Sequence, residues 1–244
     1  MEAIILAAGR GKRLNNLLNG RPKCLLEVGG RPLIDRLISV LLELGVEKII
    51  LCIGYGAEEI KKHVIREFNG CPILYVYNPF YNITNNSFTL WLARNTIKKD
   101  FLLINGDNVL DQSLITKVYR HEGTVIPIVR KREYDGEDMK VKVTPKGYVS
   151  EISKDIRDNI YGEAIGIRKV SAGDYKAFKS ALNRLVLWKR RFQSFYTEVF
   201  QDLIDRGLKI PCLDTSDFYY DEIDDEGDWV RINKEFTLKE SIGN

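Results

Sequence analysis

Residues that cross-link a chain or bind a transition metal are scarce in this sequence. Its 244 residues include 4 cysteines and 2 histidines, and no two cysteines form a CxxC pair. A disulfide framework or a zinc site needs such residues at close spacing. We therefore expect neither, and a reducing cytoplasm fits the chain best. The residues concerned are Cys24, Cys52, Cys71, Cys212, His63 and His121.

Long hydrophobic runs and an excess of one charge are also missing. The first apolar run, Ala3 to Ala8, is far shorter than a membrane span and has no basic leader before it. The 37 basic and 34 acidic residues give a net charge of +3, spread along the chain. This balance predicts no membrane segment, no export signal and no dedicated nucleic-acid binding. With 7 prolines and 44% hydrophobic residues, the composition is that of a folded globular protein.

The first half of the chain alternates between strand patterns and helix patterns. Short apolar runs are followed by amphipathic segments. This order predicts an α/β fold with a Rossmann-like, mostly parallel mixed sheet and helices on both faces. Ligands of such sheets bind beyond the carboxyl ends of the strands, where residues 6–13, 54–56 and 105–107 fall. The expected strands are 3–6, 48–53, 73–77 and 101–104, and the expected helices are 32–44, 57–68 and 87–97.

After about residue 123 the pattern changes to shorter strands. These predict a mixed sheet with a hairpin turn at Lys146-Gly147, covering the crevice. No linker or repeat interrupts the chain, so we expect one domain over 1–244. Its nucleotide-binding half spans about 1–122 and its acceptor-binding half about 123–244. The expected strands are 125–130, 140–143, 149–153 and 209–213, and the expected helices are 172–187, 195–206 and one after Asp225.

A glycine-rich loop after the first predicted strand is the first candidate for a binding site. It reads Leu6-Ala7-Ala8-Gly9-Arg10-Gly11-Lys12-Arg13-Leu14. Small residues let the backbone approach a ligand closely, and the basic residues suit phosphate oxygens. A strand-to-helix turn with solvated basic side chains is the alternative for a single GxG. A dinucleotide fingerprint is excluded because it needs a third glycine at Leu14, which also disfavours an oxidoreductase, and the P-loop spacing is absent.

The residues that follow extend this loop into a longer pattern. Pro22-Lys23 holds a lysine on a stiff stretch near the glycines, and Gly30-Arg31-Pro32-Leu33 comes next. With residues 3–14, they resemble the signature of the sugar-nucleotide pyrophosphorylase-like nucleotidyltransferases, which have a GT-A-like fold. The resemblance implies that Arg13 and Lys23 neutralise the phosphates of a bound nucleoside triphosphate during catalysis. The nucleotide-binding residues we expect are Leu6, Ala7, Ala8, Gly9, Gly11, Lys12, Arg13, Lys23, Asn85, Asn86 and Gly106.

Two aspartates are candidate ligands of Mg²⁺. Asp107 follows a predicted buried strand, so its carboxylate should project into the crevice, while Gly106 leaves room for a ribose or base. Asp224 likewise lies between a strand-like run and a helix. Oxygen ligands suit Mg²⁺, although capping of the next helix is the alternative role for Asp107. The family pairs an aspartate at each place, which implies a metal held by Asp107 and Asp224, with Asp107 in the catalytic set.

Several segments resemble the subgroup that activates phosphorylated alcohols with CTP, including phosphocholine and inositol-1-phosphate cytidylyltransferases. Asn85 or Asn86 offers the amide donor and acceptor that a cytosine edge needs, with helix capping as the alternative for one of them. Lys140 and Lys154 would bind the acceptor phosphate, with protection of a sheet edge as the alternative. The segments are Asn78 to Tyr81, Thr84 to Leu90, Met139 to Val141, Ser153-Lys154 and Gly162 to Ile167.

The acceptor is a choice between two kinds of alcohol. Seven aromatic residues would surround the quaternary ammonium of phosphocholine, or else belong to the core or to an oligomer contact such as a homodimer. Glu163, Asp135 and Glu137 would bind the hydroxyls of inositol. We expect CMP transfer from CTP to inositol-1-phosphate, with phosphocholine, a sugar-1-phosphate or a non-catalytic nucleotide-sensing role as alternatives. The aromatic residues are Trp188, Phe192, Phe195, Tyr196, Phe218, Tyr219 and Tyr220.

Overall fold

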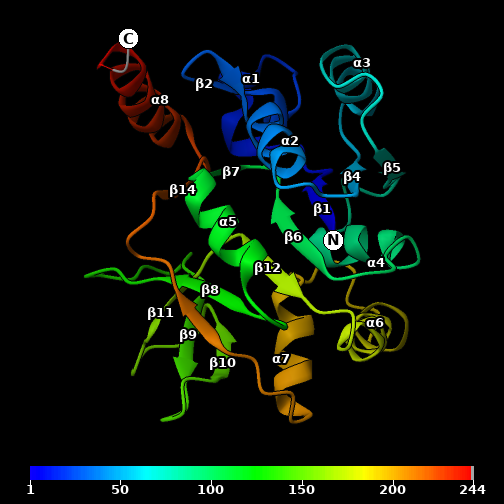
Figure 1. The fold of residues 1–244 in the computed structure, drawn as a ribbon, viewed down its shortest axis with the longest axis vertical. Coiled ribbons are helices and arrows are strands. Elements are labelled where there is room, and N and C mark those ends of the chain that lie inside the picture. Colours follow the sequence, from blue (N-terminus) through cyan, green and yellow to red (C-terminus); the bar gives the residue numbers. More distant parts are fainter. Residues whose placement is uncertain (243–244) are drawn as a thin grey trace.

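A central five-stranded sheet holds the strands predicted in the first half of the chain. The computed structural model describes residues 1–242 and orders this sheet β12-β6-β1-β4-β5 (Figure 1). Strands β6, β1, β4 and β5 run parallel, and β12 pairs antiparallel with β6. The mostly parallel sheet is therefore confirmed. The strands are β1 (Glu2–Ala7), β4 (Lys48–Ile53), β5 (Ile73–Tyr77), β6 (Phe101–Asn105) and β12 (Ile167–Val170).

Helices cover both faces of this sheet, as the apolar strands require. Side chains alternate along a strand, so Ile5 packs on the face covered by α2, α3 and α5, while Ile4 packs on the face of α4, α6 and α7. Both side chains are fully buried, and each contributes about 1.5–3 kcal/mol to folding. The helices are α2 (Leu33–Glu43), α3 (Ala57–Glu67), α4 (Asn86–Ala93), α5 (Gln112–Arg120), α6 (Tyr175–Asn183) and α7 (Thr197–Asp205).

A second five-stranded sheet, ordered β10-β9-β11-β8-β13, comes from the second half of the chain. Its strands pair antiparallel except for β13 with β8, so the predicted mixed sheet is confirmed. The hairpin turn falls at Lys146-Gly147, where Gly147 has a φ of +79°. The strands are β8 (Ile126–Val129), β9 (Lys140–Val143), β10 (Val149–Ser153), β11 (Gly162–Ala164) and β13 (Cys212–Asp214).

Short ribbons and helical turns complete the chain and place its loops. In one ribbon, β7 (Asn108–Leu110) pairs antiparallel with β14 (Tyr220–Glu222), which brings the residues after β6 next to those before α8. No helix in the described part of the chain is both long and apolar enough to cross a membrane. The other elements are β2 (Glu27–Val28), β3 (Arg31–Pro32), α1 (Asn15–Leu18), α8 (Glu226–Ile242), 3₁₀ turns at Lys12–Leu14 and Lys23–Leu25, and a π-helical turn at Arg184–Trp188.

Three predicted helices differ from the structure by more than one residue at an end. The helix expected to reach residue 97 ends at Ala93, because the Thr96 hydroxyl donates to the Ala93 carbonyl and gives the backbone a local alternative. The helix expected from residue 172 begins at Tyr175, after Asp174 has bonded to the Thr124 and Ser171 hydroxyls. The helix expected over 195–206 is the shorter α7, and the strand expected at 209–213 is β13, displaced toward the carboxyl end.

The turn after β4 supports the glycine-rich loop from behind. Tyr55 N–H donates to the Ala8 carbonyl at 3.1 Å. A Cβ atom at Gly54 would lie 2.7 Å from both the Ala8 carbonyl oxygen and the Tyr81 Cβ atom. Because the first of these contacts is with backbone, the loop could not keep its place above any larger residue.

We predict that Gly54→Ala destabilises the protein by displacing this loop. Forcing a methyl group into a packed site costs about 1–3 kcal/mol, and in a chain of this size the melting temperature falls by roughly 2–12 °C. Differential scanning calorimetry measures the shift. Gly136→Ala is the matched control, because its Cβ would have no heavy atom within 4 Å. Equal melting temperatures for the two variants would contradict the packing argument.

Candidate active site

A cavity of about 810 Å³ opens at the carboxyl ends of β1 and β6, between the two sheets. A second hollow of about 260 Å³ adjoins it beside the glycine-rich loop. Two of the three loops expected at the crevice, residues 6–13 and 105–107, line these cavities. The third, the turn at 54–56, lines neither cavity and supports the glycine-rich loop from behind. The predicted residues in the walls are Leu6, Ala7, Ala8, Gly9, Gly11, Lys12, Arg13, Lys23, Asn85, Asn86, Gly106, Asp107, Asp135, Glu137, Lys154, Glu163 and Asp224.

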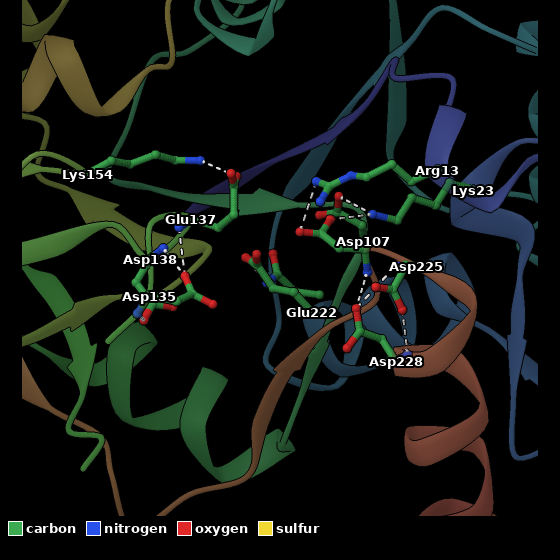
Figure 2. Close-up of polar contacts among 12 residues, drawn as sticks. Arg13, Lys23, Asp107, Asp135, Glu137, Asp138, Lys154, Glu222, Asp225 and Asp228 are labelled. Carbon is green, nitrogen blue, oxygen red and sulfur yellow. Dashed lines mark hydrogen bonds and ion pairs between the residues drawn. The ribbon is translucent and has the colours of Figure 1, made fainter. Parts of the chain in front are cut away.

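Lys23 joins the two predicted metal ligands (Figure 2). Its Nζ donates to Asp107 Oδ2 at 2.9 Å and to Asp224 Oδ1 at 3.3 Å. Arg13 Nη2 lies 3.1 Å from Asp224 Oδ2. Burial opposes the charge on Lys23, but the neighbouring Asp107 and Asp224 carboxylates outweigh burial and raise the pKa of Lys23. The four side chains come from three segments distant in sequence, and they meet where the prediction placed them.

Local backbone geometry fixes the lysine. Pro22 is extended at φ −62° and ψ 139° and leads into the 3₁₀ turn that begins at Lys23. Gly11 has a φ of +66°, and a Cβ atom there would lie 3.1 Å from the Lys23 Cβ atom. Glycine is therefore required for the loop to pass this close to the lysine.

A reciprocal cap fixes the Asp224 end of the site. Asp225 Oδ1 accepts from Asp228 N–H at 3.0 Å, and Asp228 Oδ2 accepts from the N–H groups of Asp224 and Asp225 at 3.0 and 3.1 Å. The start of α8 thus holds the backbone of Asp224 in place. The capping alternative for Asp107 does not apply, since Asp111 caps the next helix, α5, by accepting from Ser113 N–H.

The two aspartates fit a magnesium ion. They already share one cation, the Lys23 ammonium, so their carboxylates can also converge on a divalent cation. Mg²⁺ is commonly bound through one or two carboxylates together with substrate phosphates and water. In residues 1–242, no group of three or more His, Cys, Asp or Glu side chains suited to a metal occurs. The remaining ligands would therefore come from the substrate and from water.

Both candidate base-reading asparagines line the cavity, and each also has a structural contact. Asn85 is the N-cap residue of α4 and accepts from Asn86 N–H at 2.7 Å, which is the capping alternative. Asn86 Oδ1 accepts from Tyr196 N–H at 2.8 Å and so links α4 to the start of α7.

The acceptor candidates separate into two environments. Lys140 is buried and donates to the Lys154 carbonyl at 2.7 Å, so it neither lines the cavity nor protects an exposed edge. Lys154 lines the cavity and pairs with Glu137 at 2.9 Å. Glu163 is buried in the same wall, where Lys131 Nζ lies 2.5 Å from its carboxylate. Of the two lysines expected to bind the acceptor phosphate, the structure brings Lys154 to the cavity.

Among the cavity residues that the sequence analysis did not single out, three carry charges that bear on the site. Glu222 points into the space between Lys23 and Lys154 (Figure 2). Burial, together with the nearby Asp107 carboxylate, raises the pKa of Glu222. Lys131 bridges Glu163 and Asp138. Arg168 is 1% exposed and, among the described residues, hydrogen-bonds only to the carbonyls of residues 165 and 167. The spacing Glu222-x-Asp224 could have indicated the first, but no local signal marks the other two.

The predicted aromatic residues divide between the cavity and the surface. Phe195, Tyr196, Phe218 and Tyr220 line the cavity. Trp188 and Phe192 lie on the surface outside it, and Tyr219 packs against Phe236, with the ring centroids 5.6 Å apart. The cavity therefore contains aromatic side chains, but fewer of them than the sequence analysis predicted.

Nucleotidyltransferases are among the known proteins whose sequences resemble this chain. A family described as the MobA-like NTP transferase domain matches residues 3–176. A CTP:phosphoglutamine cytidylyltransferase of Campylobacter jejuni is 28% identical over 256 residues, 96% of each chain. A UTP-glucose-1-phosphate uridylyltransferase of Haloferax volcanii is 35% identical over 114 residues, which are 47% of this chain and 46% of that protein. The chain spans 19% to 55% of the length of the first curated relatives that it matches.

Solved structures share the fold over almost the whole chain. The inositol-1-phosphate CTP transferase of T. maritima superposes with a TM-score of 0.80 at 23% identity, covering 98% of this chain and 96% of that one. The CTP:phosphocholine cytidylyltransferase of Streptococcus pneumoniae gives 0.77 at 23% identity, covering 96% and 98%. The expected nucleotidyltransferase fold is confirmed.

We predict a pH-dependent loss of stability from Glu163. Burial raises the pKa of its carboxyl from 4.5 to about 7, against the opposing effect of Lys131. Between these two pH values the folded state keeps a proton that the unfolded state has released, so stability falls as pH rises through this window. Glu163→Gln stays neutral, and its free energy of unfolding should rise relative to that of the unmodified protein by about 2–4 kcal/mol from pH 4 to pH 8.

Urea unfolding at a series of pH values measures this difference. Replacing the carboxyl with an amide adds an offset that is the same at every pH, so the change across the window identifies the carboxyl. Glu137→Gln is the control, because Lys154 lowers the pKa of exposed Glu137. The free energy of unfolding of this variant, relative to that of the unmodified protein, should therefore not rise above pH 5. Parallel pH profiles for Glu163→Gln and the unmodified protein would exclude an elevated pKa.

Proposed function

Since the chain belongs to the MobA-like NTP transferase domain family, we propose that it is a Mg²⁺-dependent cytidylyltransferase. It transfers CMP from CTP to a phosphorylated alcohol and releases pyrophosphate. The observation that carries this proposal is the contact of Lys23 with Asp107 and Asp224 beside the glycine-rich loop. A non-catalytic nucleotide sensor would need the loop but not this combination of cations and paired carboxylates.

The reaction needs no protein nucleophile. An oxygen of the acceptor phosphate attacks the α-phosphorus of CTP in line, a new P–O bond forms, and the bond from the α-phosphorus to the bridging oxygen breaks as pyrophosphate leaves. The backbone of residues 8–11 lies along the triphosphate, while Lys23 and Arg13 stabilise the charge that develops on its oxygens. Asp107 and Asp224 would hold Mg²⁺, which when bound neutralises phosphate charge.

Cytosine is the proposed base because amides line the part of the cavity next to α4. Asn85 and Asn86 present their side chains there, together with the backbone of the glycine-rich loop. An amide offers both a donor and an acceptor, which match the ring nitrogen and amino group of cytosine. Cytidylyltransferases among the relatives and structural neighbours support the same choice.

Inositol-1-phosphate is the acceptor that we propose. Carboxylates of Asp135, Glu137 and Glu163 in the second-sheet wall would accept hydrogen bonds from its hydroxyls. The cations Lys154 and Arg168, in the same cavity, would bind its phosphate. Phosphocholine is the second candidate, because the aromatic rings of Phe195, Tyr196, Phe218 and Tyr220 also line the cavity and suit a quaternary ammonium. A sugar-1-phosphate acceptor is the third, from the uridylyltransferase relative.

We predict that CTP is used about 10 to 100 times better than UTP. Cytosine presents an amino donor where uracil presents a carbonyl, so the wrong base leaves a buried group unpaired at a cost of about 1–3 kcal/mol. Pyrophosphate release is measured as kcat/KM for CTP, UTP, dTTP and ATP, each with inositol-1-phosphate, phosphocholine and glucose-1-phosphate. Equal use of CTP and UTP, or activity with the sugar phosphate alone, would refute the cytidylyltransferase and leave the broader transferase family.

We also predict that Asp107→Ala lowers turnover by at least about 10²-fold while the protein stays folded, because removing a preorganised electrostatic group costs about 2.7–4 kcal/mol in the transition state. Pyrophosphate release and the melting temperature are measured together. Asp225→Ala is the matched control: it removes a neighbouring carboxylate and a helix cap, and should lower stability by about 0.5–2 kcal/mol with a smaller loss of turnover. Full activity of Asp107→Ala would remove Asp107 from the mechanism.

A further inference from the structure

A basic and aromatic segment, residues 187–192, stands on the surface where the π-helical turn that follows α6 ends. Its apolar side chains are unusually open to solvent: Leu187 is 48% exposed, Trp188 73% and Phe192 42%. The turn that presents them includes Arg190, whose φ of 52° is a conformation that arginine rarely adopts. Neither core packing nor the cavity accounts for these side chains.

The apolar surface continues onto the turn before α4. Helix α4 itself packs beside the end of α6 (Figure 1). The Phe88 ring centroid lies 5.8 Å from that of Phe192 and 6.0 Å from that of Phe80. Phe80 is 50% exposed and Ile83 in the same turn is 59% exposed. We call this surface the basic-aromatic patch and define it as Phe80, Ile83 and residues 187–192.

Positive charge accompanies the exposed rings. Lys189 and Arg190 are exposed and form no ion pair with any described residue, while Arg191 pairs with Glu198 at 2.8 Å. The patch therefore keeps two uncompensated cations next to aromatic and aliphatic side chains. Tryptophan, phenylalanine and aliphatic residues flanked by Lys and Arg are the composition of surfaces that bind the interface of an anionic bilayer.

We propose that the basic-aromatic patch docks the protein on an anionic lipid surface. Trp188, Leu187 and Phe192 enter the interface, and Lys189 and Arg190 contact lipid phosphates. Nucleic acid would use the rings and cations but not Ile83 and Leu187, and a second copy of the chain would bring like charges together. Asn85 N–H donates to the Phe192 carbonyl at 2.8 Å, and Asn85 lines the cavity, so docking holds the cavity rim near the membrane.

Vesicle binding tests the proposal. The outcome of this test does not depend on which substrate the cavity accepts. The protein is sedimented with vesicles of phosphatidylcholine alone and of phosphatidylcholine mixed with phosphatidylglycerol. Binding to the anionic vesicles should exceed binding to the neutral ones by at least about tenfold and weaken with salt. Lys189→Gln with Arg190→Gln should reduce partitioning about 30-fold, because each cation near the surface contributes about 1 kcal/mol.

Two further variants locate the contact. Lys62→Gln with Lys234→Gln removes equal charge from α3 and α8, which lie above α4 and α6 at the top of Figure 1, and should bind as the unmodified protein does. Trp188→Phe should keep binding but lose the blue shift of tryptophan emission caused by anionic vesicles. Melting temperatures verify that every variant is folded.

Three results would overturn the proposal. One is the absence of binding to phosphatidylglycerol vesicles. Another is an equal loss of binding in the α3 and α8 control, which would reduce the effect to net charge. The third is a concentration-dependent dimer without lipid that Trp188→Ala dissociates in sedimentation velocity, because the patch would then be occupied by a second copy of the chain.

Discussion

The contact of the Lys23 ammonium with two carboxylates is the constraint on which the cavity depends. A buried ammonium is stable only when the free energy lost on leaving water is offset by close partners. Its partners here are Asp107 and Asp224, which lie far apart in sequence. The β7–β14 ribbon brings them together, the cap at the start of α8 holds Asp224, and Gly11 lets the loop pass the lysine. Each of these features is explained by this one contact.

The charges around Lys23 make nucleotide and metal binding interdependent. Asp107 and Asp224 share two cations, Lys23 and Arg13. Burial, and next to it the neighbouring Asp107 carboxylate, raises the pKa of Glu222. A triphosphate would add several negative charges and compete with the aspartates for the same cations. A divalent ion held by those aspartates would offset this added charge. The proposed Mg²⁺ would thus serve charge balance as well as the proposed reaction.

Sequence patterns predicted the features that are encoded locally. The bounds of β4, β5, β9 and β10 agree with the predicted runs, because an apolar or alternating stretch between turn residues specifies a strand by itself. The position of Asp107 followed from its place after a buried strand. By contrast, the burial of Lys140 depends on the pairing of β9 with β10, and the position of Glu222 depends on the β7–β14 register. Such pairings join segments that no local pattern connects.

The acceptor half of the cavity shows how pairing determines what a cation is free to bind. Lys131 is neutralised by Glu163 and Asp138, and Lys154 by Glu137, so each would have to leave a partner to bind a substrate. Among the described residues Arg168 hydrogen-bonds only to backbone carbonyls, lies over the rings of Tyr196 and Phe200 and has no carboxylate partner, although it is almost fully buried. Keeping a buried cation without a carboxylate partner costs free energy that an anionic ligand would recover. A molecule with a phosphate for Arg168 and hydroxyls for the opposing carboxylates would satisfy both walls, and the proposed phosphorylated alcohol has both groups.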